Sequence, residues 1–450
     1  MPISLSNAVA VLFKKSETVA SSVSDVDDLY YIVPEDRIYL FGGCTSDQTC
    51  TGNPRVCRCT TATNKCMFYR PLKNNWGECA SAPVARYGHT WAKVRGKVYI
   101  VGGMYTNGTI VQKVDIYNPI NDAWDSNGIV WPEAVTDAVA WGSDITRSVY
   151  VAGGFTHNNV ALNTVTRLDT VLGSIHMDAP NMLHARGAAQ LMKLGSLYYV
   201  MGGYETRGKL ATGACSVPTH WNEAYDSLRS KWVQLPDMLY GRAGPAMGSN
   251  GKNLLFVIAG ETVDPSDSTC SHVVPVANVG LYNSTSSSWS TVDSLPSSSR
   301  FRYTSTSYYN GSFVGIYLFG GTSTFDPTCG CPPGASGSAG CGAGCFRVSD
   351  VSTLYVPVSL YSHHVRHTQP PLSAGAIAGV VIAGLTVAVV CGCVVFAVAS
   401  RYAYRYMYVR AHDEEGGPKG GAAYELDVVP SEHTSPESVN GVREATESRL

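Results

Sequence analysis

Apolar residues are concentrated in six short runs along the first 360 residues, and each run ends in a pair of small residues. The runs read RIYLFGG, KVYIVGG, SVYVAGG, LYYVMGG, LLFVIAG and IYLFGG, and their terminal pairs are Gly42-Gly43, Gly102-Gly103, Gly153-Gly154, Gly202-Gly203, Ala259-Gly260 and Gly320-Gly321. Consecutive β-branched, aromatic and aliphatic residues are typical of a buried strand, and glycine suits a point where backbones crowd. Recurrence at about 50 to 60 residues predicts a repeat architecture.

A second landmark follows the first, because an aromatic residue and a tryptophan seven positions later lie downstream of most runs. The pairs are Tyr69 and Trp76, Tyr117 and Trp124, Tyr225 and Trp232, and Tyr282 and Trp289, with Leu168 and Ile175 at the same spacing in the third unit. The intervening NPINDA and NSTSSS segments are typical of turns, so each pair predicts a hairpin. A proline and an arginine often follow: Pro83 and Arg86, Pro180 and Arg186, Pro236 and Arg242, Pro296 and Arg300.

This order of landmarks resembles the kelch repeat over about residues 25 to 360. The resemblance implies an all-β, six-bladed β-propeller over residues 25–361, with the Gly-Gly runs as second strands of four-stranded blades. Two units depart from the pattern. The third lacks both aromatic residues, which predicts a weaker anchor, and the sixth has Tyr355 but Ser362 at the tryptophan position.

The sixth unit therefore lacks a recognisable fourth strand, and an unclosed ring would leave an exposed edge. The N-terminal segment 1–24 contains a spare apolar stretch, NAVAVLF, at residues 7–13. We expect this stretch to supply the missing strand of the last blade. The alternative is a disordered leader.

Residues 374–399 form an uncharged apolar run, long enough for the roughly 20 residues that cross a bilayer as a helix. Small residues recur in it at Gly375, Gly379 and Ala383, a spacing that suits helix packing. Arg401, Arg405 and Arg410 follow directly among tyrosines, which predicts a cytoplasmic C-terminal side. The expected organisation is a type I single-pass protein with a juxtamembrane stalk at 362–373 and a disordered cytoplasmic tail at 400–450.

An extracellular or lumenal propeller requires a signal peptide, which residues 1–30 do not resemble, so we expect the true start upstream of Met1. The compartment is supported by three glycosylation sequons that begin at Asn107, Asn283 and Asn310. Clustered cysteines support the same compartment. The alternative is a cytosol-facing membrane scaffold.

Fourteen cysteines are present, and two of them, Cys391 and Cys393, lie inside the apolar run. The other twelve are disulfide candidates: Cys44, Cys50, Cys57, Cys59, Cys66, Cys79, Cys215, Cys270, Cys329, Cys331, Cys341 and Cys345. Cys215 and Cys270 stand alone in neighbouring units, which favours an inter-blade disulfide between them. Pairing among the other ten cannot be read from spacing. Zinc is the alternative, but CxxC pairs are absent.

The remaining chemistry favours binding over catalysis. The net charge of −2 gives no reason to expect a nucleic-acid partner. No GxSxG, HExxH or P-loop motif occurs, so we assign no catalytic, cofactor-binding or metal residues. His363, His364 and His367 form an HHxxH stretch that fits a solvated stalk better than a metal site.

The predicted function is binding of a protein or glycan partner through the cysteine-rich loops, because loops on a rigid scaffold often carry function. The alternative is a membrane-tethered, galactose-oxidase-like copper enzyme, since that family builds its site on a kelch propeller. At the C-terminus, Ser448 and Leu450 resemble the end of a PDZ-domain ligand.

Overall fold

The structure is a computed structural model of the whole chain. It describes residues 1–15, 17–20, 30–46, 48–51, 56–125, 128–206, 210, 212–264, 266, 273–294, 300–310, 313–326 and 345–357. The predicted membrane segment 374–399, the stalk and the tail lie outside the described residues. Within the described ranges, no helix is long and apolar enough to cross a bilayer.

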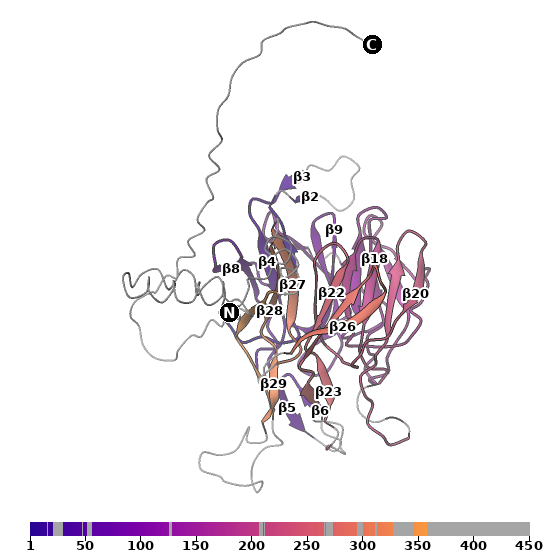
Figure 1. Cartoon of the computed structure of the whole chain (residues 1–450). Helices are drawn as coiled ribbons and strands as arrows, with labels where there is room; N and C mark the ends of the chain where they lie inside the picture. The colour runs from indigo at the N-terminus through magenta and orange to yellow at the C-terminus, as the bar shows by residue number, and fades with distance from the viewer. Residues whose placement is uncertain are drawn as a thin grey trace, which may run out of the picture. The chain divides into compact units, whose positions relative to one another are not determined.

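The described strands form six antiparallel blades, which confirms the predicted all-β propeller (Figure 1). Blade 1 contains β1 (Val9–Phe13), β4 (Arg37–Phe41), β7 (Cys66–Arg70) and β8 (Asn75–Cys79); blade 2 contains β9 (Tyr87–Val94), β10 (Lys97–Met104), β11 (Asp115–Asn118) and β12 (Ala123–Asp125); blade 3 contains β13 (Val139–Ser143), β14 (Ser148–Ala152), β15 (Val165–Asp169) and β16 (Ile175–His176).

The second half of the ring repeats this order. Blade 4 contains β17 (Gln190–Leu194), β18 (Leu197–Met201), β19 (Asn222–Asp226) and β20 (Lys231–Leu235); blade 5 contains β21 (Ala246–Ser249), β22 (Leu254–Ile258), β25 (Asn278–Asn283) and β26 (Ser288–Ser294); blade 6 contains β27 (Thr304–Asn310), β28 (Phe313–Phe319) and β31 (Ser352–Tyr355). Blade 6 thus has three strands in the part of the chain that is described.

Both sequence landmarks lie at equivalent places in successive blades. The small-residue pairs directly follow the second strands, except in blade 2, where Gly102 and Gly103 lie inside β10 just before its end. At Gly102, φ is +69° and an added Cβ would lie 2.4 Å from the Val135 carbonyl oxygen. The aromatic residues and tryptophans are direct cross-strand partners, as in Tyr117 with Trp124 and Tyr225 with Trp232. In blade 3, Leu168 and Ile175 form the same cross-strand pair, and the fully buried Trp131 belongs to their core cluster. The bulk missing from that hairpin is therefore supplied by an inter-blade connection.

The predicted role of the N-terminal stretch is wrong. Strand β1 pairs with β4, with Val9 opposite Phe41 and Phe13 opposite Arg37, so it is the innermost strand of blade 1 rather than a strand of blade 6. The Gly-Gly strand of the first unit has an inner neighbour like that of every other unit, and β1 is that neighbour. The propeller consequently includes residues that were assigned to a separate N-terminal segment.

The ring closes instead through residues just before β1. In blades 1 to 4 the second glycine donates to the connection that leads into the next blade, as Gly43 donates to the Arg86 carbonyl at 2.8 Å and Gly154 to the Arg186 carbonyl at 2.9 Å. In blade 6, Gly321 donates to the Leu5 carbonyl at 2.8 Å, and the Leu5 N–H donates to Ser349 at 2.9 Å. The N-terminal segment therefore takes the place of the inter-blade connection between blades 6 and 1.

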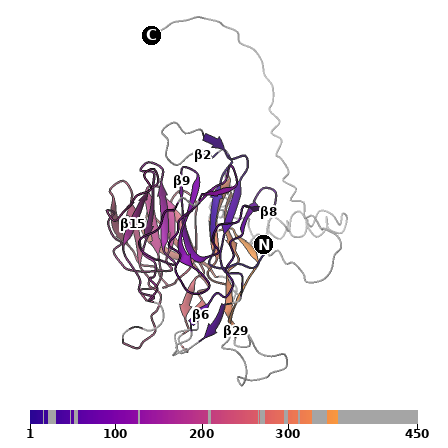
Figure 2. The same cartoon turned by 180° about the vertical axis from the view of Figure 1, so that it is seen from behind.

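The two ends of the propeller differ. At the loop face, which we define as the end where the second strands finish, the connections to the third strands carry extra strands (Figures 1 and 2). These are β5 (Gln48–Thr51), β6 (Val56–Arg58), β23 (Glu261–Val263), β24 (Val273–Pro275), β29 (Thr322–Asp326) and β30 (Cys345–Val348). At the opposite end, the turn face, a hairpin of β2 (Thr18–Ala20) and β3 (Tyr30–Ile32) projects from blade 1 (Figure 1).

Candidate interaction face

The loop face carries an accessory sheet that joins blade 1 to blade 6. Its strand order is β29-β30-β5-β6, so hairpins from two blades that are far apart in sequence form one sheet. The junction pairs Cys345 with Thr49 and Phe346 with Gln48 across β30 and β5. Loops of the first and sixth units therefore share one region, next to the place where the ring closes.

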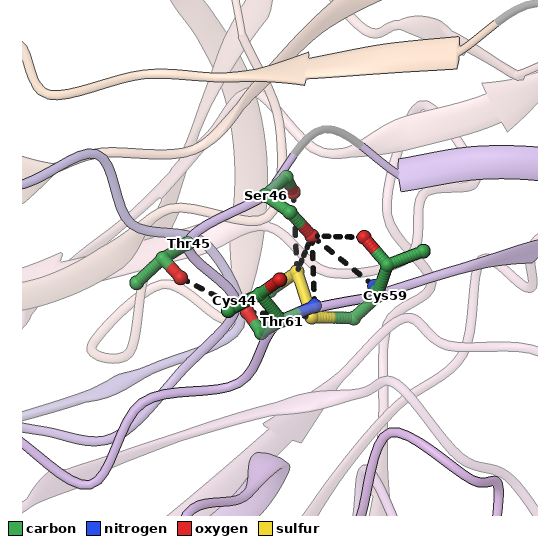
Figure 3. Close-up of a disulfide and its surroundings, with 6 residues drawn as sticks. Cys44, Thr45, Ser46, Cys59 and Thr61 are labelled. Carbon is green, nitrogen blue, oxygen red and sulfur yellow. Dashed lines mark hydrogen bonds between the residues drawn. A yellow bond between two sulfur atoms is a disulfide. The ribbon is translucent and has the colours of Figure 1, made fainter.

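A disulfide between Cys44 and Cys59 closes the base of the β5–β6 hairpin, with 5.7 Å between the Cα atoms (Figure 3). Both cysteines are buried. The Ser46 hydroxyl oxygen accepts hydrogen bonds from the backbone N–H groups of Thr60 and Thr61 at 3.1 and 2.9 Å (Figure 3). The base of the accessory sheet is thus fixed covalently and by hydrogen bonds to the serine.

A second disulfide, between Cys66 and Cys79, joins the third and fourth strands of blade 1, where the two residues are cross-strand partners. Cys215 is also disulfide-bonded, while its predicted partner Cys270 lies outside the described residues, so that pairing stays a prediction. Cys50 and Cys57 are opposite each other in the backbone register of β5 and β6, and Cys345 begins β30. Cys329, Cys331 and Cys341 lie outside the described residues.

A group of exposed apolar side chains lies on three connections at the loop face of blades 3 to 5. It contains Leu183 from the connection between blades 3 and 4, Val217 from the loop between β18 and β19, and Leu239 and Tyr240 from the connection between blades 4 and 5. Their exposed fractions are 47%, 65%, 52% and 47%. Exposed apolar residues are common singly, but a group on neighbouring loops is typical of an interaction surface.

A stacked pair of rings lies next to these residues in the chain. The imidazole of His184 lies 4.1 Å from the Trp221 ring, centroid to centroid, at an interplanar angle of 25°. In the residue before Trp221, the Nδ1 atom of His220 lies 3.0 Å from the carbonyl oxygen of Met238, which directly precedes Leu239. We call Leu183, Val217, Leu239, Tyr240 and the His184–Trp221 pair the blade 4 patch.

A buried ion pair is hydrogen-bonded to the backbone of two of these connections. Arg186 and Glu223 are fully buried and paired, Arg186 also donates to the Trp221 carbonyl at 3.0 Å, and Glu223 accepts from the Leu183 N–H at 2.7 Å. Burial lowers the pKa of Arg186, and the negative charge of Glu223 opposes this effect. The proline–arginine landmark of the sequence contained Arg186 but gave no role to it, because Glu223 lies 37 residues further along the chain.

The central channel opens among the innermost strands and encloses about 510 Å³. Six channel-lining residues with positive φ, one per blade, surround it near the loop face: Asn7, Gly88, Asp137, Ala188, Gly244 and Arg302. The N–H groups of Gly88, Asp137, Ala188 and Gly244 donate to the preceding member at 3.0, 2.7, 2.9 and 2.8 Å, and Asn7 donates to Arg302 at 3.4 Å. Backbone hydrogen bonds thus follow the ring across its closure.

Charged and titratable groups line the channel beside this ring. Arg302 donates to both carboxylate oxygens of Glu261 at 2.7 and 3.1 Å. His89 is buried with its Nε2 atom 3.0 Å from the Phe41 carbonyl oxygen. Burial, with the positive charge of Arg86, lowers the pKa of His89 to about 3, so the ring is neutral at pH 7. Among the described residues, no group of three or more His, Cys, Asp or Glu is arranged to hold a metal ion.

The sequons lie on both faces. Asn107 is exposed in the loop after β10, on the loop face. Asn283 and Asn310 end β25 and β27, at the turn face, and the Asn283 side-chain oxygen accepts from the Thr285 N–H at 2.9 Å. Glycosylation at each of the three stays a prediction. The C-terminal Ser448 and Leu450 lie outside the described residues.

Comparison with known proteins agrees with this architecture. A family model described as "Kelch motif" matches residues 85–126, which are blade 2 with the connection before it. Kelch-like protein 23 of Homo sapiens is 25% identical over 303 residues, which are 66% of this chain and 46% of that protein. The chain therefore spans about half the length of this relative.

Other similarities are shorter or structural. An F-box/kelch-repeat protein of Arabidopsis thaliana is 32% identical over 151 residues, 32% of this chain and 36% of that protein. A solved structure titled "Structure of YjhT" has a TM-score of 0.53 at 14% identity, and the match covers 79% of this chain and 96% of that one. At that identity the likeness concerns the fold alone. Together these findings support a kelch-repeat β-propeller.

Proposed function

We propose that this protein is a binding module that holds a protein partner on its loop face, with the blade 4 patch as the main contact. The observation that carries the proposal is the group of exposed apolar side chains on three adjacent loops, supported by a buried Arg186–Glu223 pair. An apolar centre on a preorganised surface is typical of protein-binding hot spots. The kelch-like relatives support a binding role in general.

We further propose that residues 374–399 anchor the module in a membrane as a type I single-pass protein, with the propeller on the extracellular or lumenal side. The sequence supports this arrangement through the uncharged run and the arginines that follow it. The two disulfides of blade 1 are compatible with an oxidising compartment.

The binding proposal is tested by comparing substitutions on the two faces in the full-length protein. Leu239→Asp with Tyr240→Asp places charges in the blade 4 patch, whereas Ile145→Asp with Leu228→Asp changes turn-face residues that are 94% and 77% exposed. Proximity labelling with the unaltered protein defines a set of labelled proteins. Cells that express the loop-face pair should lose that set, and cells that express the turn-face pair should keep it. Loss for both pairs, or for the turn-face pair alone, contradicts the proposal.

Membrane topology is tested separately by glycosidase treatment and thiol labelling of protein expressed from its native locus. We expect a mobility shift that Asn107→Gln reduces, and cysteines upstream of the apolar run that resist labelling. An unshifted band with reactive thiols would instead place the propeller in the cytosol.

A further inference from the structure

Blade 6 leaves one strand edge uncovered in the described part of the chain. In blades 1 to 5 a fourth strand follows the third and pairs with it, but no described strand lies beside the outer edge of β31. Leu354 of β31 belongs to the apolar cluster between blades 6 and 1, with Tyr69, Trp76 and Phe319. The Ser352 hydroxyl, also on β31, is buried without a hydrogen-bond partner. An open edge with such surroundings favours the addition of a strand.

The indole of Trp76 shows where that strand would end. Trp124, Trp232 and Trp289 donate their indole N–H to the backbone carbonyls of Ala80, Pro180 and Pro236 at 2.7, 2.8 and 2.8 Å. Each acceptor comes soon after the fourth strand of the preceding blade.

Trp76 holds the equivalent position in blade 1. Its ring lies 5.6 Å from that of Phe319 in blade 6, as the ring of Trp124 lies 5.4 Å from that of Phe41 in blade 1. Among the described residues, however, the Trp76 N–H has no acceptor. By analogy with the other three tryptophans, the acceptor for this N–H would be a carbonyl that follows a fourth strand of blade 6.

We propose that the outer edge of β31 and the Trp76 N–H form one strand-docking site, and that residues 358–366 of this chain occupy it. The spacing supports this occupant, because Ser362 follows Tyr355 as Trp124 follows Tyr117. Ala80 and Pro236 each lie four positions after the tryptophan of their own blade, and four positions after Ser362 is Arg366. The Arg366 carbonyl is thus assigned as the acceptor for Trp76.

The docked strand would orient the propeller, a consequence that rests on the proposed membrane anchor. Fourth strands run toward the loop face, as β8 does when it ends at Cys79 opposite Cys66. Only residues 367–373 would then separate the loop face from the apolar run, and seven extended residues span at most about 25 Å. The loop face would lie toward the bilayer, so its protein partner would be one that lies at or in the same membrane.

Hydrogen exchange on the full-length protein in detergent tests the docking site. We expect backbone amides in 359–364 to exchange more slowly than those in 367–373. Trp76→Phe should raise their exchange about fivefold, the loss expected for one hydrogen bond. Trp289→Phe removes the corresponding bond in blade 5 and should leave 359–364 unchanged.

A second variant guards against a general effect of Trp76→Phe on folding. Tyr361→Pro removes a backbone donor within the proposed strand and should abolish the slow exchange, whereas Thr368→Pro should not. Fast exchange of 359–364 in the unaltered protein overturns the proposal, and so does protection that grows with protein concentration, since that would assign the edge to a second copy. Slow exchange in a chain that fails to associate with membranes would leave the docking site standing and reject the anchor.

Discussion

Buried arginines that precede blades 2, 4 and 5 show how one sequence landmark serves different local environments. Arg86 pairs with Asp115 and Arg186 with Glu223, and all four side chains are almost completely buried. Arg242 donates instead to the carbonyls of Ala259 and Asn278, each at 2.8 Å. Burial lowers the pKa of Arg242 to about 10, which still leaves it charged at pH 7. The sequence reveals the arginines, but their partners lie too far along the chain to be inferred from spacing.

Arg186→Ala should therefore destabilise the protein strongly. Glu223 would remain buried without its cation, which costs about 3 to 5 kcal/mol in the free energy of unfolding. Arg167→Ala is the matched control, because its partner Asp178 has a side chain that is 56% exposed, and an exposed pair contributes about 1 kcal/mol or less. Urea denaturation of both variants provides the comparison. Equal losses would contradict the structural role given to Arg186.

His89 should make the protein sensitive to acid. Its pKa is about 3 in the folded protein and about 6.5 in an unfolded chain, so below pH 6.5 the unfolded state takes up the proton first. The stability present above pH 6.5 then falls by up to about 1.4 kcal/mol per pH unit until the folded pKa is reached. Between pH 6.5 and 4.5, the free energy of unfolding of the His89→Gln variant should fall by roughly 2 kcal/mol less than that of the unaltered protein.

Urea midpoints at several pH values test this expectation, with the exposed His157→Gln as the control. Both variants retain the carboxylates that also respond to acid, so only the difference between them reports on His89. Parallel stability curves for the two variants would refute the prediction.

At the scale of single elements, the sequence predicted which strands form but not always which strands pair with one another. The Gly-Gly strands and the aromatic hairpins were predictable because apolar period, turn residues and a fixed spacing agree. The stretch at residues 7–13 was correctly identified as a candidate strand, yet its partner was not. An apolar stretch of this length fits either the inner edge of blade 1 or the outer edge of blade 6. The choice depends on the Leu5 and Asn7 hydrogen bonds, which no local pattern encodes.

The disulfide at the base of the β5–β6 hairpin should stabilise the loop face. The double substitution Cys44→Ser with Cys59→Ser removes a cross-link over 15 residues, which costs about 2 to 4 kcal/mol. Urea unfolding under non-reducing conditions measures the loss. Relative to the unaltered protein, hydrogen exchange should accelerate more in β5 and β6 than in β7 and β8. The pair Cys66→Ser with Cys79→Ser serves as the control, since it should reverse that order. Unaltered exchange in β5 and β6 would argue against the hairpin as a disulfide-fixed element.

At the scale of the whole molecule, closure of the ring depends on contacts between the N-terminal segment and the last blade. The sequence predicted the number of blades, since one run marks each, and it predicted that insertions gather on one face. It did not predict the apolar patch at blade 4, which combines residues from three connections that are separate in sequence. Nor did it predict the ring of left-handed residues, because Asn7, Asp137 and Arg302 have no common residue type.

Deletion of residues 1–7 should therefore uncouple blades 6 and 1 rather than trim a disordered leader. It removes the bond from Gly321 to Leu5, the bond from Gly88 to Asn7 and the reciprocal pair between Ser6 and Cys44 at 2.9 and 2.8 Å. It also removes Leu5, which is 1% exposed in the cluster between these blades. We expect urea unfolding to become less cooperative. As urea is raised, hydrogen exchange should accelerate at Gly321 and Cys44 before it accelerates in blades 3 and 4. Deletion of residues 412–450, a separate unit, is the control that should leave unfolding unchanged. A truncated chain that still unfolds in one sharp transition at the original midpoint would show that the ring closes without its N-terminal segment.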